Sequence, residues 1–351
     1  MIAETRGPLD AMHFDDFWYV LAESAELRAR SVLARSVLGQ RLVVFRGVDG
    51  RAAALPDCCL HRNAPLSGGC VHNGELICPY HGWRYDATGR VTRIPSQLPA
   101  TDYGHHLSTL DVCEQDGYLY VRLKLAGPDT IKPWRMHGYD ERGWRHIRLR
   151  NRFANTVTNC VENFIDVPHT AFVHRGIFRS SRGERISATV TRTEGAVRVD
   201  YRNESTNLGT WRRFLNPRGK EIRHTDYFLV PNVTCVTYEI GMHTFIITSQ
   251  SVPVGPDDGG DTLVYTDLTY NFGLFNDLAR PFVRWYGQRV INQDVAILAA
   301  QMQNIRRYGA RFRDTPADVI HRCVESLREA IARGEDPHTL PALKQEVEFY
   351  V

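Results

Sequence analysis

The chain has 351 residues, which is too long for one ordinary hydrophobic core and suits two domains. Its 43% apolar and 24% charged residues are typical of a globular protein, and a net charge of +3 is too small to indicate nucleic acid as a partner. No apolar run approaches the ~20 residues of a membrane-spanning helix. Residues 1–14 include acidic side chains and lack the apolar segment of a secretory signal.

The cysteines are too scattered for a disulfide framework in so long a chain. We expect two of them to be metal ligands and the others to be reduced, buried thiols, which favours a cytoplasmic protein. The eight lie at positions 58, 59, 70, 78, 113, 160, 235 and 323.

The first third of the chain is rich in short strand patterns. Phe14–Leu27 is predicted to be an entry strand and a turn, and Val37–Val48 and Ala52–Leu55 to be strands joined by a hairpin turn at Asp49-Gly50. Gly117–Leu123 is predicted to close the sheet. Residues 14–126 are therefore expected to form a small antiparallel β domain that presents its functional groups on loops.

Two short pairs of metal ligands lie in the loops of this domain. Cys59-Leu60-His61 and Cys78-Pro79-Tyr80-His81 are separated by sixteen residues, and each offers one thiolate and one imidazole. Two cysteines on one iron and two histidines on the other are the ligand set of a Rieske [2Fe–2S] centre. The stretch therefore predicts such a cluster, held by Cys59, His61, Cys78 and His81.

A zinc site is the alternative, because zinc accepts the same ligand atoms. Structural zinc sites usually pair Cys with Cys and His with His, so the mixed pairs favour the iron–sulfur cluster. Cys58 is one residue too far from His61 for the motif. We interpret it as a thiol packed behind the ligands.

Residues 127–351 are predicted to form a second, α+β domain. Ala126–Asp129 is the expected boundary, and Asp257–Gly260 is an expected turn. Strand patterns follow one another before a single long terminal helix, which argues for an antiparallel sheet with helices laid on it. The predicted strands are Val190–Tyr201, Thr225–Leu229, Val233–Ile240, Phe245–Val254 and Thr262–Phe272.

A second candidate metal site lies in residues 159–174. On a helix at about 100° per residue, one narrow face would carry Asn159, Glu162, Asp166 and His169. Pro168 disfavours a continuous helix, so a bent backbone could bring His169 and His174 onto one ion. A polar helix face with two surface histidines is the alternative. Interleaved apolar residues indicate that some of the polar groups are buried, and buried polar groups need partners such as a metal.

Two imidazoles leave an open iron site short of one carboxylate. Asp294 is the best candidate, because helical spacing over Phe282–Tyr308 places it within an apolar stripe, where a carboxylate is costly unless neutralised. A buried ion pair with an arginine, or a local break in amphipathicity, would also explain it. Asp267 and Asp277 are weaker candidates, since their positions suit solvent exposure.

With both sites in view, the chain resembles the terminal oxygenase subunits of the Rieske non-haem iron oxygenases, of the short type without a β subunit. The resemblance implies a catalytic domain with a helix-grip, START-like fold. It implies that His169, His174 and Asp294 hold a mononuclear Fe(II), with Glu162 and Asn159 supporting them. It further implies a homotrimer in which Asp166 bridges His81 of one subunit and His169 of the next. Gln293 and Ala299 depart from the acidic residues common near the third ligand.

The resemblance implies an enzyme that hydroxylates or oxidatively demethylates a hydrophobic ring compound with O2. Electrons would come from NAD(P)H through a reductase or ferredoxin. Cis-dihydroxylation of an arene is the nearest alternative, and an electron carrier or a START-like binding module without catalysis is an alternative of another class. Apolar residues suited to such a substrate are Phe228, Tyr238, Phe245 and Phe272, although core packing explains them equally well.

Overall fold

The computed structural model describes residues 12–99, 102–124, 132–174, 185–202, 222–255 and 260–350. It divides into an N-terminal unit (residues 15–135 and 252–257) and a C-terminal unit (residues 1–14, 136–251 and 258–351). The expected boundary at Ala126–Asp129 lies outside the described residues, as does most of the expected turn at Asp257–Gly260.

The N-terminal unit consists of three small antiparallel sheets, ordered β1-β10-β9, β2-β3-β4 and β5-β6-β7-β8. One core cluster joins apolar side chains such as Phe45, Leu55 and Trp83 with Cys59 and Cys78, so both expected thiolate ligands are anchored in the core. The strands are β1 Tyr19–Glu23, β2 Leu33–Val37, β3 Gln40–Arg46, β4 Ala52–Pro56, β5 Cys70–His72, β6 Glu75–Ile77, β7 Arg84–Tyr85, β8 Val91–Arg93, β9 Asp111–Gln115 and β10 Tyr118–Arg122.

The single strand expected over Val37–Val48 is wrong at its start. Val37 ends β2, and Leu38 and Gly39 turn the chain into β3 with positive φ values of 49° and 72°. Two consecutive residues with positive φ form the tight hairpin turn that suits twisted strands. Leucine rarely adopts this conformation, so Leu38 did not indicate a turn at this position.

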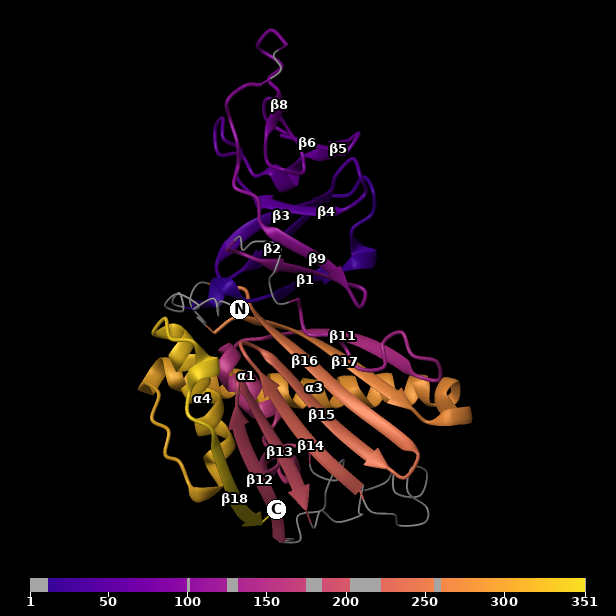
Figure 1. Cartoon of the computed structure of the whole chain (residues 1–351), viewed down its shortest axis with the longest axis vertical. Helices are drawn as coiled ribbons and strands as arrows, with labels where there is room; N and C mark the ends of the chain where they lie inside the picture. The colour runs from indigo at the N-terminus through magenta and orange to yellow at the C-terminus, as the bar shows by residue number, and fades with distance from the viewer. Residues whose placement is uncertain are drawn as a thin grey trace, which may run out of the picture. The chain divides into compact units, whose positions relative to one another are not determined.

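The C-terminal unit is built on one eight-stranded antiparallel sheet, ordered β11-β17-β16-β15-β14-β13-β12-β18 (Figure 1). This confirms the α+β class and the antiparallel sheet. The strands are β11 Arg145–Phe153, β12 Arg185–Thr193, β13 Ala196–Arg202, β14 Ile222–Leu229, β15 Val233–Ile240, β16 His243–Pro253, β17 Thr262–Asn271 and β18 Leu343–Tyr350.

Two expectations about this sheet are corrected. Val190–Tyr201 is not one strand, because Glu194 and Gly195, with φ of 48° and 73°, form the hairpin between β12 and β13. The long helix is also not the last element. It is followed by α4 (Val319–Ala332) and by β18, which pairs with β12 at the sheet edge.

The long helix α3 (Asn276–Tyr308) packs on β11 and β17, and the short helix α1 (Val157–Phe164) contacts β15. Figure 1 shows α3 running across the sheet. Gly287 permits close packing, since a Cβ at this position would lie only 2.3 Å from Leu268 Cδ1 on β17. The middle of α3 therefore lies close against β17.

Candidate metal centres and cavity

The first candidate site is formed by the loops that follow β4 and β6. Cys59 and Cys78 are buried, His61 is half-buried and His81 is exposed. The two imidazole rings lie edge to face with their centroids 4.4 Å apart. The loops thus place two thiols inward and two imidazoles toward the surface.

Two aromatic residues that follow His81 in the chain contact the ligand side chains of this site. The indole of Trp83 is stacked on His61, with centroids 5.0 Å apart and an interplanar angle of 4°. The Tyr85 hydroxyl lies 3.1 Å from Cys59 Sγ and also accepts a hydrogen bond from the Leu60 amide. Burial and the neighbouring Cys59 raise the pKa of Tyr85, so its hydroxyl keeps the proton that it donates to a thiolate.

The donor set fits a [2Fe–2S] cluster. His61 Nδ1 is buried and finds no hydrogen-bond partner among the described residues, and a bound iron would satisfy it. Burial raises the pKa of the Cys78 thiol, and a metal cation would offset the cost of its ionisation.

The other six cysteines differ in burial, whereas the sequence predicted that they would be buried. Cys58 is exposed rather than packed behind the ligands, because its side chain points away from the core that holds Cys59. Cys70 is exposed as well, and Cys113 and Cys235 are half-buried. Cys160 and Cys323 are buried, as the composition suggested.

The second candidate site begins at the end of α1. Thr156 caps this helix by accepting a hydrogen bond from the Asn159 amide, and the helix ends at Phe164. Pro168 then starts a short 3-10 turn, Pro168–Ala171, in the first-turn position where proline needs no amide hydrogen. The backbone is therefore bent between Asp166 and His169, as Pro168 predicted.

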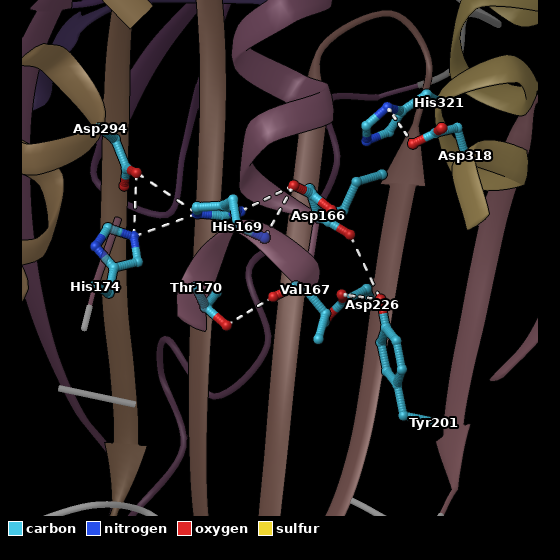
Figure 2. A network of polar contacts seen from close by, with 11 residues as sticks. Asp166, Val167, His169, Thr170, His174, Tyr201, Asp226, Asp294, Asp318 and His321 are labelled. Atoms are coloured by element: carbon cyan, nitrogen blue, oxygen red, sulfur yellow. Dashed lines mark hydrogen bonds and ion pairs between the residues drawn. The ribbon is translucent and has the colours of Figure 1, made fainter. Parts of the chain in front are cut away.

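Three side chains from distant parts of the chain converge here (Figure 2). His169 Nε2 and His174 Nε2 are 3.3 Å apart, and they lie 3.6 and 3.1 Å from Asp294 Oδ1. Two ligands about 2.1 Å from one ion are about 3.0–3.4 Å apart at bond angles of 90–109°. The observed spacing therefore fits a divalent transition-metal ion, and the donor set is the two-histidine, one-carboxylate triad of non-haem iron.

Neighbouring groups orient both imidazoles. His174 Nδ1 lies 3.0 Å from Gln293 Oε1, and His169 Nδ1 lies 3.2 Å from Asp166 Oδ2. The hydrogen bond from His174 Nδ1–H to Gln293, and the Asp166 carboxylate beside His169 Nδ1, turn the Nε2 atom of each ring toward the third side chain, Asp294. Gln293 thus supplies a neutral acceptor at the position where the sequence departs from the family pattern.

The electrostatics also favour a cation. Burial alone lowers the pKa of His169, but the carboxylates of Asp166 and Asp294 outweigh it and raise the pKa to about 9. Burial raises the pKa of Asp294, and the two imidazoles bring it below its usual value. Asp294 Oδ1 is buried without a well-formed hydrogen bond from the described residues, so a metal ion among the three groups would complete its coordination.

The weaker carboxylate candidates lie elsewhere. Asp277 is exposed in the first turn of α3 and pairs with Arg145. Asp267 is fully buried on β17, where it pairs with Arg148 at 2.9 Å, so the expectation of solvent exposure is wrong. A buried ion pair with arginine, considered for Asp294, is thus the solution adopted by Asp267.

Asn159 and Glu162 contact neither imidazole through the hydrogen bonds of the described residues. Asn159 Nδ2 donates to Asn155, whose own amide donates to the Leu298 carbonyl and ties α1 to α3. Glu162 lies near Glu325 and Arg328 of α4, and burial together with Glu325 raises its pKa to about 8.

An apolar cavity of about 610 Å³ lies between α1, α3 and the sheet, and the three converging residues form part of its wall. Tyr238, Phe245 and Phe272 line it, but Phe228 is fully buried in the core. The volume is in the range of pockets for drug-sized molecules.

The cavity wall contains polar residues that the sequence reasoning missed. These are His224 and Asp226, with His224 Nε2 2.8 Å from Asp226 Oδ1. Tyr201 does not line the cavity but supports Asp226 (Figure 2): its hydroxyl donates to Asp226 Oδ2 at 3.1 Å and lies 3.5 Å from the Ile165 carbonyl oxygen. The alternation of β14 was a usable signal, because it puts His224 and Asp226 on the same inner face as Ile222 and Phe228.

Two family descriptions match the chain. A Rieske [2Fe–2S] domain matches residues 17–107, and the vanillate O-demethylase oxygenase C-terminal domain matches residues 155–323.

The chain is also similar in sequence to individual proteins. The chain is 34% identical over 171 residues to cholesterol 7-desaturase nvd of Bombyx mori, covering 48% of this chain and 37% of that protein. It is 30% identical over 193 residues to the oxygenase component of dicamba O-demethylase of Stenotrophomonas maltophilia, covering 52% and 54%. The chain thus aligns with about half, or less, of the length of these relatives.

The crystal structure of dicamba monooxygenase bound to dicamba superposes with a TM-score of 0.77 at 20% identity. The match covers 92% of this chain and 98% of that one, so the two share a fold along their whole length. Within the part of the chain that the structure describes, no helix is long and apolar enough to cross a membrane.

Proposed function

We propose, since this chain belongs to the Rieske oxygenase alpha subunits of the vanillate and dicamba O-demethylase type, that it is the terminal oxygenase of a multicomponent system. Its reaction would be hydroxylation or oxidative demethylation of a hydrophobic, ring-containing small molecule. The observation that carries this proposal is the convergence of His169, His174 and Asp294 on the wall of a large apolar cavity.

In this proposal Cys59, His61, Cys78 and His81 hold the Rieske cluster, and His169, His174 and Asp294 hold Fe(II). When bound, the iron supplies O2 activation with electrons delivered from the cluster. The chain's own residues orient the metal ligands and bind the substrate. Asp166 and Gln293 fix the two imidazoles, and the apolar wall holds the substrate and limits the access of water.

The electron route is proposed to cross between subunits of a homotrimer. His81 is exposed at the surface of the N-terminal unit, so its ring edge is available to a second protein body. Asp166 is partly exposed and already contacts His169. A carboxylate with one side on His169 and the other toward solvent suits a bridge to His81 of a neighbouring subunit.

The electron donor is proposed to be a reductase or ferredoxin that draws on NAD(P)H, in the cytoplasm. Demethylation is preferred to arene dihydroxylation because dicamba and vanillate O-demethylases are among the relatives. Hydroxylation of an O- or N-methyl carbon gives a hemiacetal or a hemiaminal, which releases formaldehyde. Each turnover would consume one O2, two electrons from the donor and two protons, and would form one water.

The test is O2 consumption with a surrogate reductase and a panel of O- and N-methylated aromatic compounds. We expect at least one compound to stimulate O2 uptake with formaldehyde formed in equal amount. Substrate-independent O2 uptake that persists in Asp294→Ala would overturn the proposal.

A further inference from the structure

The cavity is elongated along α3. Its lining includes residues of this helix from Leu278 to Asp294, which are sixteen positions apart and therefore about 24 Å apart along the helix axis. Leu278 and Phe282 are mostly exposed, whereas Asp294 is 5% exposed. The cavity thus has an apolar mouth near the start of α3 and an inner end at the metal-binding residues.

The strands that line the cavity give an estimate of its length. Strand registers pair Ile240 with His243 and Val236 with Ile247, and these residues line the cavity. Successive inward residues of a strand are about 6.8 Å apart, so His243 lies roughly 14 Å from Ile247. Ile247 belongs to the same cross-strand row as Asp226, which Tyr201 links to the backbone beside Asp166.

His243 therefore lies toward the mouth. Its ring meets Phe272 edge to face at 6.1 Å, and Phe272 precedes the start of α3.

The Nδ1 atom of His243 is buried and has no hydrogen-bond partner among the described residues. Its neighbours on the wall, Ile240, Phe245 and Phe272, offer no side-chain donor or acceptor. Some other polar groups of the wall are bonded within the protein, for example Ser249 to Thr266 and His224 to Asp226. A buried ring nitrogen in an apolar cavity needs a partner, and a bound molecule is the one that the cavity can admit.

Asn163 Oδ1 is also buried without a partner in the described part of the chain, and it too lines the cavity. Asn163 lies on α1 three residues before Asp166, at the inner end. The unpartnered atoms on the wall thus occur at both ends of the cavity, which suits a molecule that spans it.

We propose, building on the function proposed above, that His243 is a specificity-determining residue that binds the remote end of an elongated, uncharged substrate. Its Nδ1 hydrogen-bonds a hydroxyl group at the opposite end of the substrate from the carbon that reaches the metal site, over a length on the order of the roughly 14 Å between His243 and Ile247. A hydroxyl suits either tautomer of the imidazole, because it can donate or accept. The substrate class is a molecule of three or four linked or fused rings with a terminal hydroxyl.

The test uses rigid aromatic rulers of two lengths. The probes are 4-methoxy-p-terphenyl with and without a 4″-hydroxyl, and the shorter 4-methoxybiphenyl with and without a 4′-hydroxyl. Dissociation constants are measured anaerobically on the metal-loaded enzyme by ligand fluorescence, so that no turnover is needed.

We expect the hydroxylated terphenyl to bind about tenfold more tightly than its partner, and the biphenyls to bind alike. His243→Phe should abolish the terphenyl difference, and His243→Asn should restore part of it through its side-chain amide. His321→Phe, on α4 outside the cavity, is the matched control and should keep the full difference.

Equal binding of the two terphenyls, a difference that persists in His243→Phe, or no binding of any terphenyl would overturn the inference. A hydroxyl-dependent difference in an enzyme that turns over no substrate would leave it standing and count against the proposed function alone.

Discussion

The two candidate metal centres use histidine in contrasting ways. The cluster ligands come from two loops within residues 59–81, and their imidazoles face the surface while their thiols are buried. The mononuclear ligands come from residues 169–294, and they meet at the inner end of an apolar cavity. The first centre thus has its imidazoles near the surface, and the second is enclosed by the apolar wall of a cavity.

The comparison also shows how each centre depends on its surroundings. Cluster ligation is specified by local spacing, whereas the mononuclear site requires α3 to be packed on the sheet in one register. The close approach of Gly287 in α3 to Leu268 on β17 and the contact of Asn155 with α3 secure that register. A substitution should therefore be able to remove the mononuclear iron without disturbing the cluster.

The largest effect is expected for Asp294→Ala. Loss of the carboxylate leaves two imidazoles, which should abolish mononuclear iron and reduce turnover by roughly 1000-fold or more. The visible absorption of the Rieske cluster should be unchanged. Asp277→Ala, an exposed position on the same helix, is the control and should keep both iron and activity. Retained mononuclear iron in Asp294→Ala would point to another third ligand.

A smaller effect is expected for Asp166→Asn. The amide still supports His169 sterically but no longer carries the charge, so both centres should stay occupied while electron transfer between them slows roughly 100-fold. Single-turnover product formation with a pre-reduced cluster measures this. Asp261→Asn, which removes a surface ion pair with Arg152, is the control. A normal single-turnover yield and rate in Asp166→Asn would refute the bridging role.

Tyr85→Phe tests the cluster side of the comparison. Its hydroxyl stabilises the electron-rich reduced cluster through Cys59 Sγ, so removing it should lower the reduction potential by roughly 50–100 mV. Tyr80→Phe, which alters an exposed tyrosine on the loop before β7, should change the potential little. Equal potentials for the wild type and Tyr85→Phe in a redox titration would show that the hydroxyl does not bond the thiolate.

The last prediction concerns the stability of the fold near the mononuclear site, rather than iron content or electron transfer. The folded-state pKa of Glu162, about 8, lies above its unfolded value near 4.5, so the free energy of unfolding falls as pH rises from about 4.5 to 8 and is level above that. Glu162→Gln removes this penalty. We expect the variant to gain up to about 4 kcal/mol at pH 9 and little at pH 4.5 in urea unfolding. A gain that is the same at both pH values would contradict the burial of this carboxyl.

The sequence predicted the two centres unequally well. The pairs at Cys59 and Cys78 are local, so spacing alone indicated a cluster. Asp294 could be singled out because a carboxylate interrupts an apolar helix face. The residues around Asp267 show no comparable pattern, so its burial on a strand could not be predicted. The turns at Leu38–Gly39 and Glu194–Gly195 were hidden because each lies within a run of strand-forming residues.

The cavity residues were harder still to predict. Tyr201, His224 and Asp226 share one face only because β13 and β14 pair in a particular register. The sequence pattern does not distinguish His243 from other strand residues, and its position beside Phe272 appears only in the folded chain. Such contacts between distant segments are set by tertiary packing, so they cannot be predicted from the residue pattern of one segment.

The central claim is that one chain holds a sulfur-bridged iron pair and a separate single iron. The most direct measurement is the ratio of iron to acid-labile sulfide in protein reconstituted and desalted without air, for the wild type and for Asp294→Ala. The account predicts three irons and two sulfides per chain in the wild type, and two of each in the variant. Two irons and two sulfides in both proteins would contradict it.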